Sequence, residues 1–189
     1  MPGAVTSPQA TTPHDVPSDR AGEDAPARDA SLTAESVVDD ARWLAATDGA
    51  LDADVRTWLD ALSAELEIGR GDFTLLFTND ARITELNAQF RNIERATNVL
   101  SFPSGDDDYI GDVALSFDTV QREAVGAGRP FQDHMAHLVM HGALHLLGHD
   151  HDDEESAVIM ERIETSALAR VGIPDPYGAA ATSDGKSES

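Results

Sequence analysis

The segment FQDHMAHLVMHGALHLLGHDH, residues 131–151, decides what kind of fold and site this chain builds. Pro130 stands directly before it, where proline suits the first turn of a helix, and we predict a helix over about 131–147. His141 and His145 are four residues apart on that helix. This spacing puts their Cβ atoms on one face, about 5–6 Å apart, so that two imidazoles can share one metal ion.

The turn that follows supplies a third candidate ligand. Gly148 comes three residues after His145, where glycine commonly ends a helix in the left-handed conformation. The chain then turns back, and His151 can approach the histidine pair from outside the helix. Three neutral imidazoles with one open position are typical of a catalytic zinc site, so we predict one Zn²⁺ per chain on His141, His145 and His151. His149 would be the third ligand if the helix continued unbroken.

Four further polar residues are expected at the rim of this site or behind its ligands. His134 and His137 share the helix face with the histidine pair, but no turn brings them round the same ion. Asp150 is the residue that we expect to orient a ligand imidazole through a hydrogen bond. We therefore assign rim or supporting positions to His134, His137, His149 and Asp150.

The predicted metal site favours a hydrolase, because zinc on three imidazoles lowers the pKa of its bound water to about 7. Zinc peptidases of the H-E-x-x-H type use the glutamate as their general base. Gly142 occupies that position here, and glycine cannot accept a proton. The missing glutamate thus disfavours a metallopeptidase, which is the first alternative. A non-enzymatic scaffold with a structural zinc is the second.

The rest of the pattern predicts one α+β domain with a single sheet of about four strands and about five helices. Strands are expected where apolar side chains alternate, at 41–47, 73–78, 98–103 and 111–118. Helices are expected where apolar side chains recur every three or four residues. These are 54–67, capped by Asp52 or Asp54, a helix after Asn79 or Asp80 that carries Ile83, Leu86 and Phe90, and 118–127, 131–147 and 153–170.

The two ends of the chain differ from the middle in composition. They are rich in small and polar residues and poor in large apolar ones. Such segments do not bury enough surface to offset the entropy of ordering. We therefore predict a disordered acidic N-terminal extension at 1–38, a functional domain at 39–177 and a disordered C-terminal tail at 178–189.

The charge of the chain restricts its partners. Its 189 residues carry 35 acidic and 13 basic side chains, a formal net charge of −22. That charge repels nucleic acid, so a role on RNA needs a local patch, a metal, a partner or strong salt screening. The absence of cysteine excludes disulfides and thiolate metal sites. Neither a secretory signal nor an apolar run of about 18 residues is visible, and we predict a cytoplasmic protein.

Three segments together resemble one known family. HGALHLLGHDH (141–151) is similar to the signature of the YbeY family, bacterial metal-dependent endoribonucleases of ribosomal RNA maturation. LNAQFRNIERATNVLSFP (86–103) and GDVALSF (111–117) resemble further segments of that family in the same order. The resemblance covers about residues 40–177. It implies a mixed four-stranded sheet flanked by helices, with a zincin-like metal helix.

The resemblance also implies roles for residues and partners. It assigns zinc to the three histidines and a catalytic contact with RNA phosphate to Arg91. The implied function is 3′-end processing of small-subunit ribosomal RNA, with ribosome assembly and quality control. The implied partners are ribosomal RNA or the pre-ribosomal small subunit, a small-subunit ribosomal protein and the GTPase Era, with no membrane. After Arg91 the family usually has a lysine, an acid and a proline, where this chain has Ile93, Glu94 and Ala96, and His149 replaces a usual tyrosine.

Overall fold

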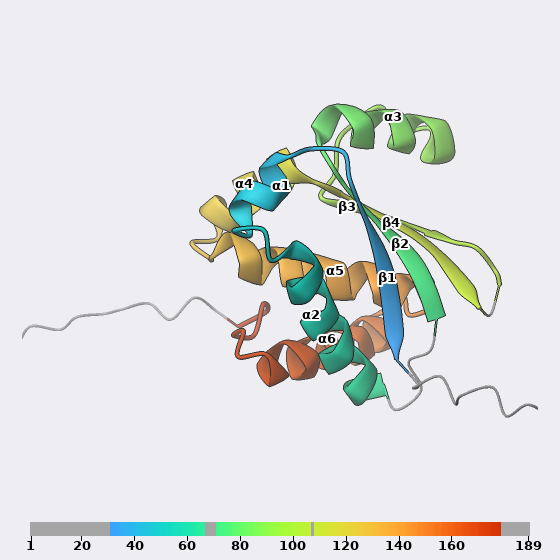
Figure 1. The fold of residues 1–189 in the computed structure, drawn as a ribbon. Helices are drawn as coiled ribbons and strands as arrows, with labels where there is room; N and C mark the ends of the chain where they lie inside the picture. Colours follow the sequence, from blue (N-terminus) through green and yellow to red (C-terminus); the bar gives the residue numbers. More distant parts are fainter. Residues whose placement is uncertain (1–30, 67–70, 107, 179–189) are drawn as a thin grey trace, which may run out of the picture.

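The computed structural model describes residues 31–66, 71–106 and 108–178, which form one α+β domain, as predicted. Its sheet is mixed and four-stranded, in the order β1-β2-β4-β3, with β3 antiparallel to β4 and the other pairs parallel (Figure 1). The elements in chain order are β1 (Leu32–Val38), α1 (Arg42–Ala46), α2 (Leu51–Leu66), β2 (Gly71–Thr78), α3 (Asp80–Arg91), β3 (Val99–Pro103), β4 (Tyr109–Ser116), α4 (Phe117–Gly126), α5 (Phe131–Leu146) and α6 (Glu154–Arg170).

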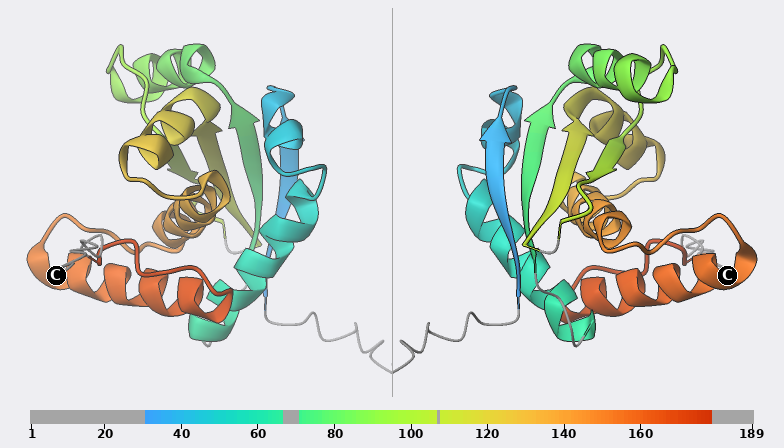
Figure 2. Two further views of the ribbon diagram at one scale, coloured as in Figure 1. Left: turned by 90° about the vertical axis from the view of Figure 1, so that its left-hand side faces the viewer. Right: turned by 90° about the vertical axis from the view of Figure 1, so that its right-hand side faces the viewer.

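Helices cover the two faces of the sheet unequally. On one face, α2 packs against β1 and α5 packs against β3 and β4, while α6 contacts both of these helices (Figures 1 and 2). The side chains of the central strands that face this layer are at most 1% exposed; they are Phe73, Leu75, Phe77, Val113 and Leu115. Burying each contributes about 1.5–3 kcal/mol. On the other face, α3 packs through Ile83 onto Leu100 and Ala114.

The start of the domain differs from the prediction. The strand expected at 41–47 is wrong, because Arg42–Ala46 forms helix α1, and the fourth strand is Leu32–Val38, inside the range predicted to be disordered. This strand lies at an edge of the sheet, where Leu32 is its one fully buried side chain and Ala34 and Val38 pack against the core only in part. Hydrogen bonding to β2 and the bond from the Leu32 N–H to the Ser63 hydroxyl also stabilise it. Residues 1–30 and 179–189 of the predicted tails lie outside the described residues.

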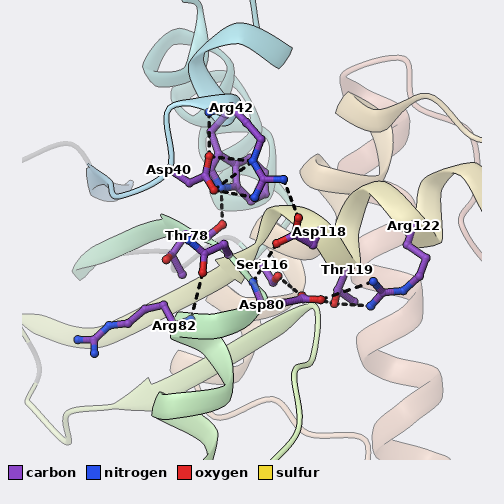
Figure 3. Close-up of polar contacts among 11 residues, drawn as sticks. Asp40, Arg42, Thr78, Asp80, Arg82, Ser116, Asp118, Thr119 and Arg122 are labelled. Atoms are coloured by element: carbon purple, nitrogen blue, oxygen red, sulfur yellow. Dashed lines mark hydrogen bonds and ion pairs between the residues drawn. The ribbon is translucent and has the colours of Figure 1, made fainter.

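Charged residues join the carboxyl ends of the three parallel strands (Figure 3). Arg42 donates to both carboxylate oxygens of Asp40 and, at 2.6 Å, to Asp118. The hydrogen bonds from Arg42 lower the pKa of Asp40 to about 2. Asp118 in turn accepts the backbone N–H of Asp80, and Asp80 accepts the hydroxyl of Ser116. These contacts fix the first turn of α3 against β4 and α4, and so determine where its last residue lies.

The prediction of the other elements is confirmed to within a few residues. Asn79 caps α3 by accepting the N–H of Arg82, as expected for a helix N-terminus. Helix α2 begins at Leu51, before the aspartates that we expected to cap it. Among the described residues, no helix is long and apolar enough to cross a membrane.

Candidate metal centre and its cleft

Three imidazoles meet at the C-terminal end of α5. His141 and His145 lie one turn apart on the helix, and His151 returns to them from the loop that follows. One ring nitrogen from each lies within 4.8 Å of the other two. The Nε2 atoms of His141 and His145 are 3.1 Å apart. A tetrahedral zinc ion with Zn–N bonds of about 2.05 Å separates its ligand nitrogens by about 3.3 Å, so this donor set fits zinc.

The end of α5 explains why His151 joins the cluster. Gly148 has φ of +84°, and the N–H of His149 bonds back to the Leu144 carbonyl at 3.0 Å. This 6→1 bond with a left-handed glycine is a Schellman-type helix end. The predicted helix termination is therefore confirmed. His149 leaves the stripe of α5 and lines the cleft beside the cluster.

Burial adjusts the protonation of His145, the middle histidine of the cluster. Burial lowers the pKa of His145, and the neighbouring His141 and His151 lower it further. A histidine binds a metal through the lone pair of a neutral imidazole. The surroundings of His145 therefore favour the metal-binding form at neutral pH.

A buried carboxylate that the sequence did not reveal supports His141 from behind. Glu164 of α6 is 0% exposed, and its Oε1 atom lies 2.8 Å from Nδ1 of His141. Its Oε2 atom lies 3.2 Å from Nε2 of His137 and accepts the hydroxyl of Tyr177. Burial raises the pKa of Glu164, but these hydrogen bonds outweigh it and lower the pKa to about 2. The carboxylate is ionised and holds His141 with its Nε2 atom toward the cluster.

The other predicted supporting residues lie at different distances from the cluster. His137 contacts it through Glu164, whereas Nε2 of His134 bonds to Glu123 at 2.8 Å. The carboxylate of Asp150 accepts the backbone N–H of His151 at 2.7 Å. Asp150 therefore shapes the turn at the rim, and the carboxylate that contacts a clustered imidazole is Glu164.

The cluster opens into a cleft of about 410 Å³ between the end of α5 and strand β3. Arg91, the last residue of α3, lines the same cleft and donates an N–H to the Ser101 carbonyl at 3.2 Å. The structure thus brings Arg91 together with His145 and His151, although Arg91 is at least 54 positions away from both in sequence. His149, Asp150 and Asp152 complete the rim.

Gly142 lets α5 approach the sheet closely. A Cβ atom at this position would lie 2.6 Å from Cγ1 of Val113, closer than real Cβ contacts. The Ser101 hydroxyl also donates to the Gly142 carbonyl at 3.1 Å. A glutamate, the general base of the H-E-x-x-H peptidases, has no room here.

Comparison with known proteins identifies relatives of this chain. A family model described as Endoribonuclease YbeY matches residues 38–172. A protein named endoribonuclease YbeY from Methylocella silvestris is 48% identical over 120 residues, 61% of this chain but only 65%, just under two thirds, of that protein. Another of that name from a Ruegeria species is 41% identical over 162 residues, 75% of this chain and 94% of its relative.

Among solved structures, the solution structure of a Thermotoga maritima protein matches with a TM-score of 0.44 and 23% identity, covering 78% of this chain and 98% of that one. The family match is the stronger finding, since it spans more than half of the chain and includes Arg91 and the three clustered histidines. The chain belongs to the YbeY family.

Proposed function

We propose that this chain is a zinc-dependent endoribonuclease of ribosomal RNA maturation, acting at the 3′ end of small-subunit ribosomal RNA in the cytoplasm. The observation that carries the proposal is the cleft itself. Two of the three convergent imidazoles, His145 and His151, line it together with Arg91, a residue type suited to phosphate. The names of the relatives support the endoribonuclease part of the proposal.

His141, His145 and His151 are the proposed ligands of a single zinc ion per chain. When bound, zinc on such a site supplies a water of pKa about 7 as nucleophile and polarises a phosphate oxygen. Glu164 holds the first of these imidazoles in the tautomer that presents Nε2. Burial lowers the pKa of His145, which favours its neutral, metal-binding form.

Arg91 has the proposed role of gripping the scissile phosphate. Only one of its N–H groups is needed for the bond to Ser101, and a guanidinium carries five in a planar fork. The remaining donors suit a bidentate contact with phosphate oxygens and stabilise the charge that develops during phosphodiester cleavage. The fold positions this side chain through α3, whose first turn is fixed by the charged contacts of Figure 3.

The strong negative charge limits how RNA reaches the cleft. Asp150 and Asp152 stand at the rim, and Ile93 occupies the place of a usual family lysine. Affinity from phosphate contacts alone is therefore expected to be weak. We propose that recruitment by the pre-ribosomal small subunit, including a small-subunit ribosomal protein and the GTPase Era, compensates for it.

The crowding at Gly142 argues against the peptidase alternative, because no general base fits where such enzymes carry one. The scaffold alternative differs in one respect from the proposal. It requires the metal for folding but gives Arg91 no chemical task.

One experiment tests the proposal against both alternatives. Zinc per chain and cleavage of a small-subunit RNA 3′-end transcript are measured on one preparation, with and without chelator, at about 0.1 M and about 1 M KCl. We expect one zinc per chain, cleavage that chelator abolishes, and loss of cleavage in His145→Ala and Arg91→Ala. A zinc-loaded, folded wild type that leaves the RNA intact at both salt concentrations refutes the enzyme. A folded Arg91→Ala variant that still supports full RNA processing in cells favours the scaffold.

A further inference from the structure

A buried carboxylate, Glu164 of α6, lies behind the histidine cluster of α5. This carboxylate receives three donors from two parts of the chain: His141 and His137 of α5, and the hydroxyl of Tyr177, which follows α6. A carboxylate has about four acceptor positions, so three of them are used here. A fully buried ion with this many partners is held in one orientation.

The orientation of Glu164 determines which ring nitrogen of His141 carries the proton. Oε1 accepts from Nδ1 of His141 at 2.8 Å, which requires the proton to be on Nδ1 and leaves the lone pair on Nε2. Nε2 is the atom that faces His145. In the opposite tautomer, a lone pair would face the buried carboxylate, and Nε2 would carry a proton toward the ligand cluster. Glu164 therefore selects the form of His141 that can bind a metal.

Tyr177 is held in place by the segment that carries it. The Arg129 guanidinium donates to the Pro176 carbonyl, and the Tyr177 N–H donates to Asp175 at 2.8 Å. Asp175 also accepts the Thr165 hydroxyl at 3.2 Å, which ties the segment to α6. Residues 175–177 thus form a strap, anchored to α6 and to the loop before α5, that brings a phenol to Glu164.

We propose that Glu164 is a positioning residue of the metal centre and that the Tyr177 hydroxyl, acting through Glu164, raises its affinity for zinc. This inference rests on the proposed zinc site, but it does not depend on the RNA activity. The C-terminal strap is then part of the metal centre, although it lies outside the ligand motif. Its contribution is to hold the carboxylate that holds His141.

A competing assignment makes Glu164 a ligand. One atom each of His137, His141 and Glu164 also lie within 4.8 Å of one another. A second ion there would take Nδ1 of His141 from its hydrogen bond and compete with the Tyr177 proton. The two assignments predict different numbers of ions per chain, one for positioning and two for ligation.

The chain contains matched controls for both substitutions. Glu123 accepts Nε2 of His134 at 2.8 Å on the same helix face but contacts none of the three clustered imidazoles. Tyr109, the other of the two tyrosines, donates to Asp112 at 2.7 Å on the sheet. Glu123→Gln and Tyr109→Phe therefore remove equivalent groups elsewhere.

The test measures zinc stoichiometry and dissociation constant by chelator competition in the full chain, with thermal unfolding of the metal-free protein as the check on folding. Glu164→Gln should weaken zinc binding by about 10–100-fold. Tyr177→Phe should weaken it by about 3–10-fold, because it removes one hydrogen bond to a charged group. Glu123→Gln and Tyr109→Phe should stay within about twofold of wild type. In the Glu164→Gln background, Tyr177→Phe should have no further effect, because the hydroxyl acts through the carboxylate.

Three results overturn the inference. One is zinc affinity within twofold of wild type in both Glu164→Gln and Tyr177→Phe. Another is an equal loss from Tyr177→Phe in both backgrounds. The third is two ions in wild type and one in Glu164→Gln, which makes Glu164 a ligand. If Glu164→Gln does not fold, Tyr177→Phe decides alone, since it alters an exposed residue. If the wild type binds no zinc, the proposed zinc site is refuted. If His145→Ala abolishes zinc binding while Glu164→Gln and Tyr177→Phe bind zinc as the wild type does, only the positioning role is refuted.

Discussion

Replacing Gly142 by alanine tests how closely α5 packs against the sheet. The added Cβ would lie 2.6 Å from Cγ1 and 3.2 Å from Cγ2 of Val113, and 3.4 Å from the Ser101 hydroxyl. Val113 is 0% exposed, so its side chain has no free space to move into. Either α5 or β4 must shift to accept the new methyl group.

Two opposing terms set the magnitude. Alanine is favoured over glycine inside a helix by about 1 kcal/mol. Inserting a methyl group into a packed core costs about 1–3 kcal/mol. The sum is a loss of about 1 kcal/mol for Gly142→Ala in the wild type. In a Val113→Ala background both clashing atoms are gone, and the same change should stabilise the protein by about 1 kcal/mol. The coupling between the two positions is therefore about 2 kcal/mol.

The assay is urea unfolding of the metal-free chain followed by the fluorescence of Trp43 and Trp58, both at most 6% exposed. Four proteins complete the cycle: wild type, the two single variants and the double variant. A coupling below about 0.5 kcal/mol, or a Gly142→Ala variant more stable than wild type, refutes the packing argument. It would also reopen the peptidase alternative, because room for a side chain at this position is what that alternative needs.

Three further predictions concern the cleft and the charged contacts. Arg91→Ala should lower RNA cleavage by about 10²-fold or more, while its zinc content and its urea midpoint stay close to those of wild type, because the side chain is exposed. His149→Phe should leave zinc affinity within about threefold of wild type, as measured by chelator competition, since this imidazole lies outside the cluster; a loss as large as that of His151→Ala would contradict the assignment. The pKa of Asp40 is about 2 in the folded chain against 3.8 for the free group, so its contribution to stability should be complete above pH 4 and fade as the pH falls toward 2. Stability curves of wild type and Arg42→Ala should therefore converge in acid, and a gap that stays constant from pH 7 to pH 2 would contradict it.

Local signals in the sequence were sufficient for most of the domain. The alternation of Phe73, Leu75 and Phe77 predicted β2, and Asn79 followed by an apolar stripe predicted α3. Both patterns result from burial on one side, which leaves a period of two or 3.6 residues. The predictions at the start of the domain were wrong because β1 and α1 bury few side chains and so leave only a weak pattern. An edge strand buries little, and the five-residue helix α1 owes its burial to Trp43, which packs against rings from distant elements.

The candidate site shows the same division between local and distant information. The i, i+4 histidine pair and Gly148 lie close together in the chain, so helix geometry alone was enough to predict that His141, His145 and His151 meet. Nothing local linked Arg91 to them, and only the resemblance to a family did so before the structure placed it in the same cleft.

The carboxylate behind His141 had to come from outside the motif for a geometric reason. A carboxylate next to a clustered histidine in the sequence lies in the same turn of the chain. Its side chain therefore reaches backbone N–H groups of that turn, as Asp150 accepts the N–H of His151. The rear nitrogen of a helical imidazole faces whatever packs on that helix, which here is α6. The trace in the sequence is a carboxylate inside an apolar stripe, Met160, Glu164 and Leu168, where burial of an unpaired charge would be costly. Such a residue implies a buried donor on the facing helix, and in a chain whose facing helix carries a histidine motif that donor is one of its imidazoles.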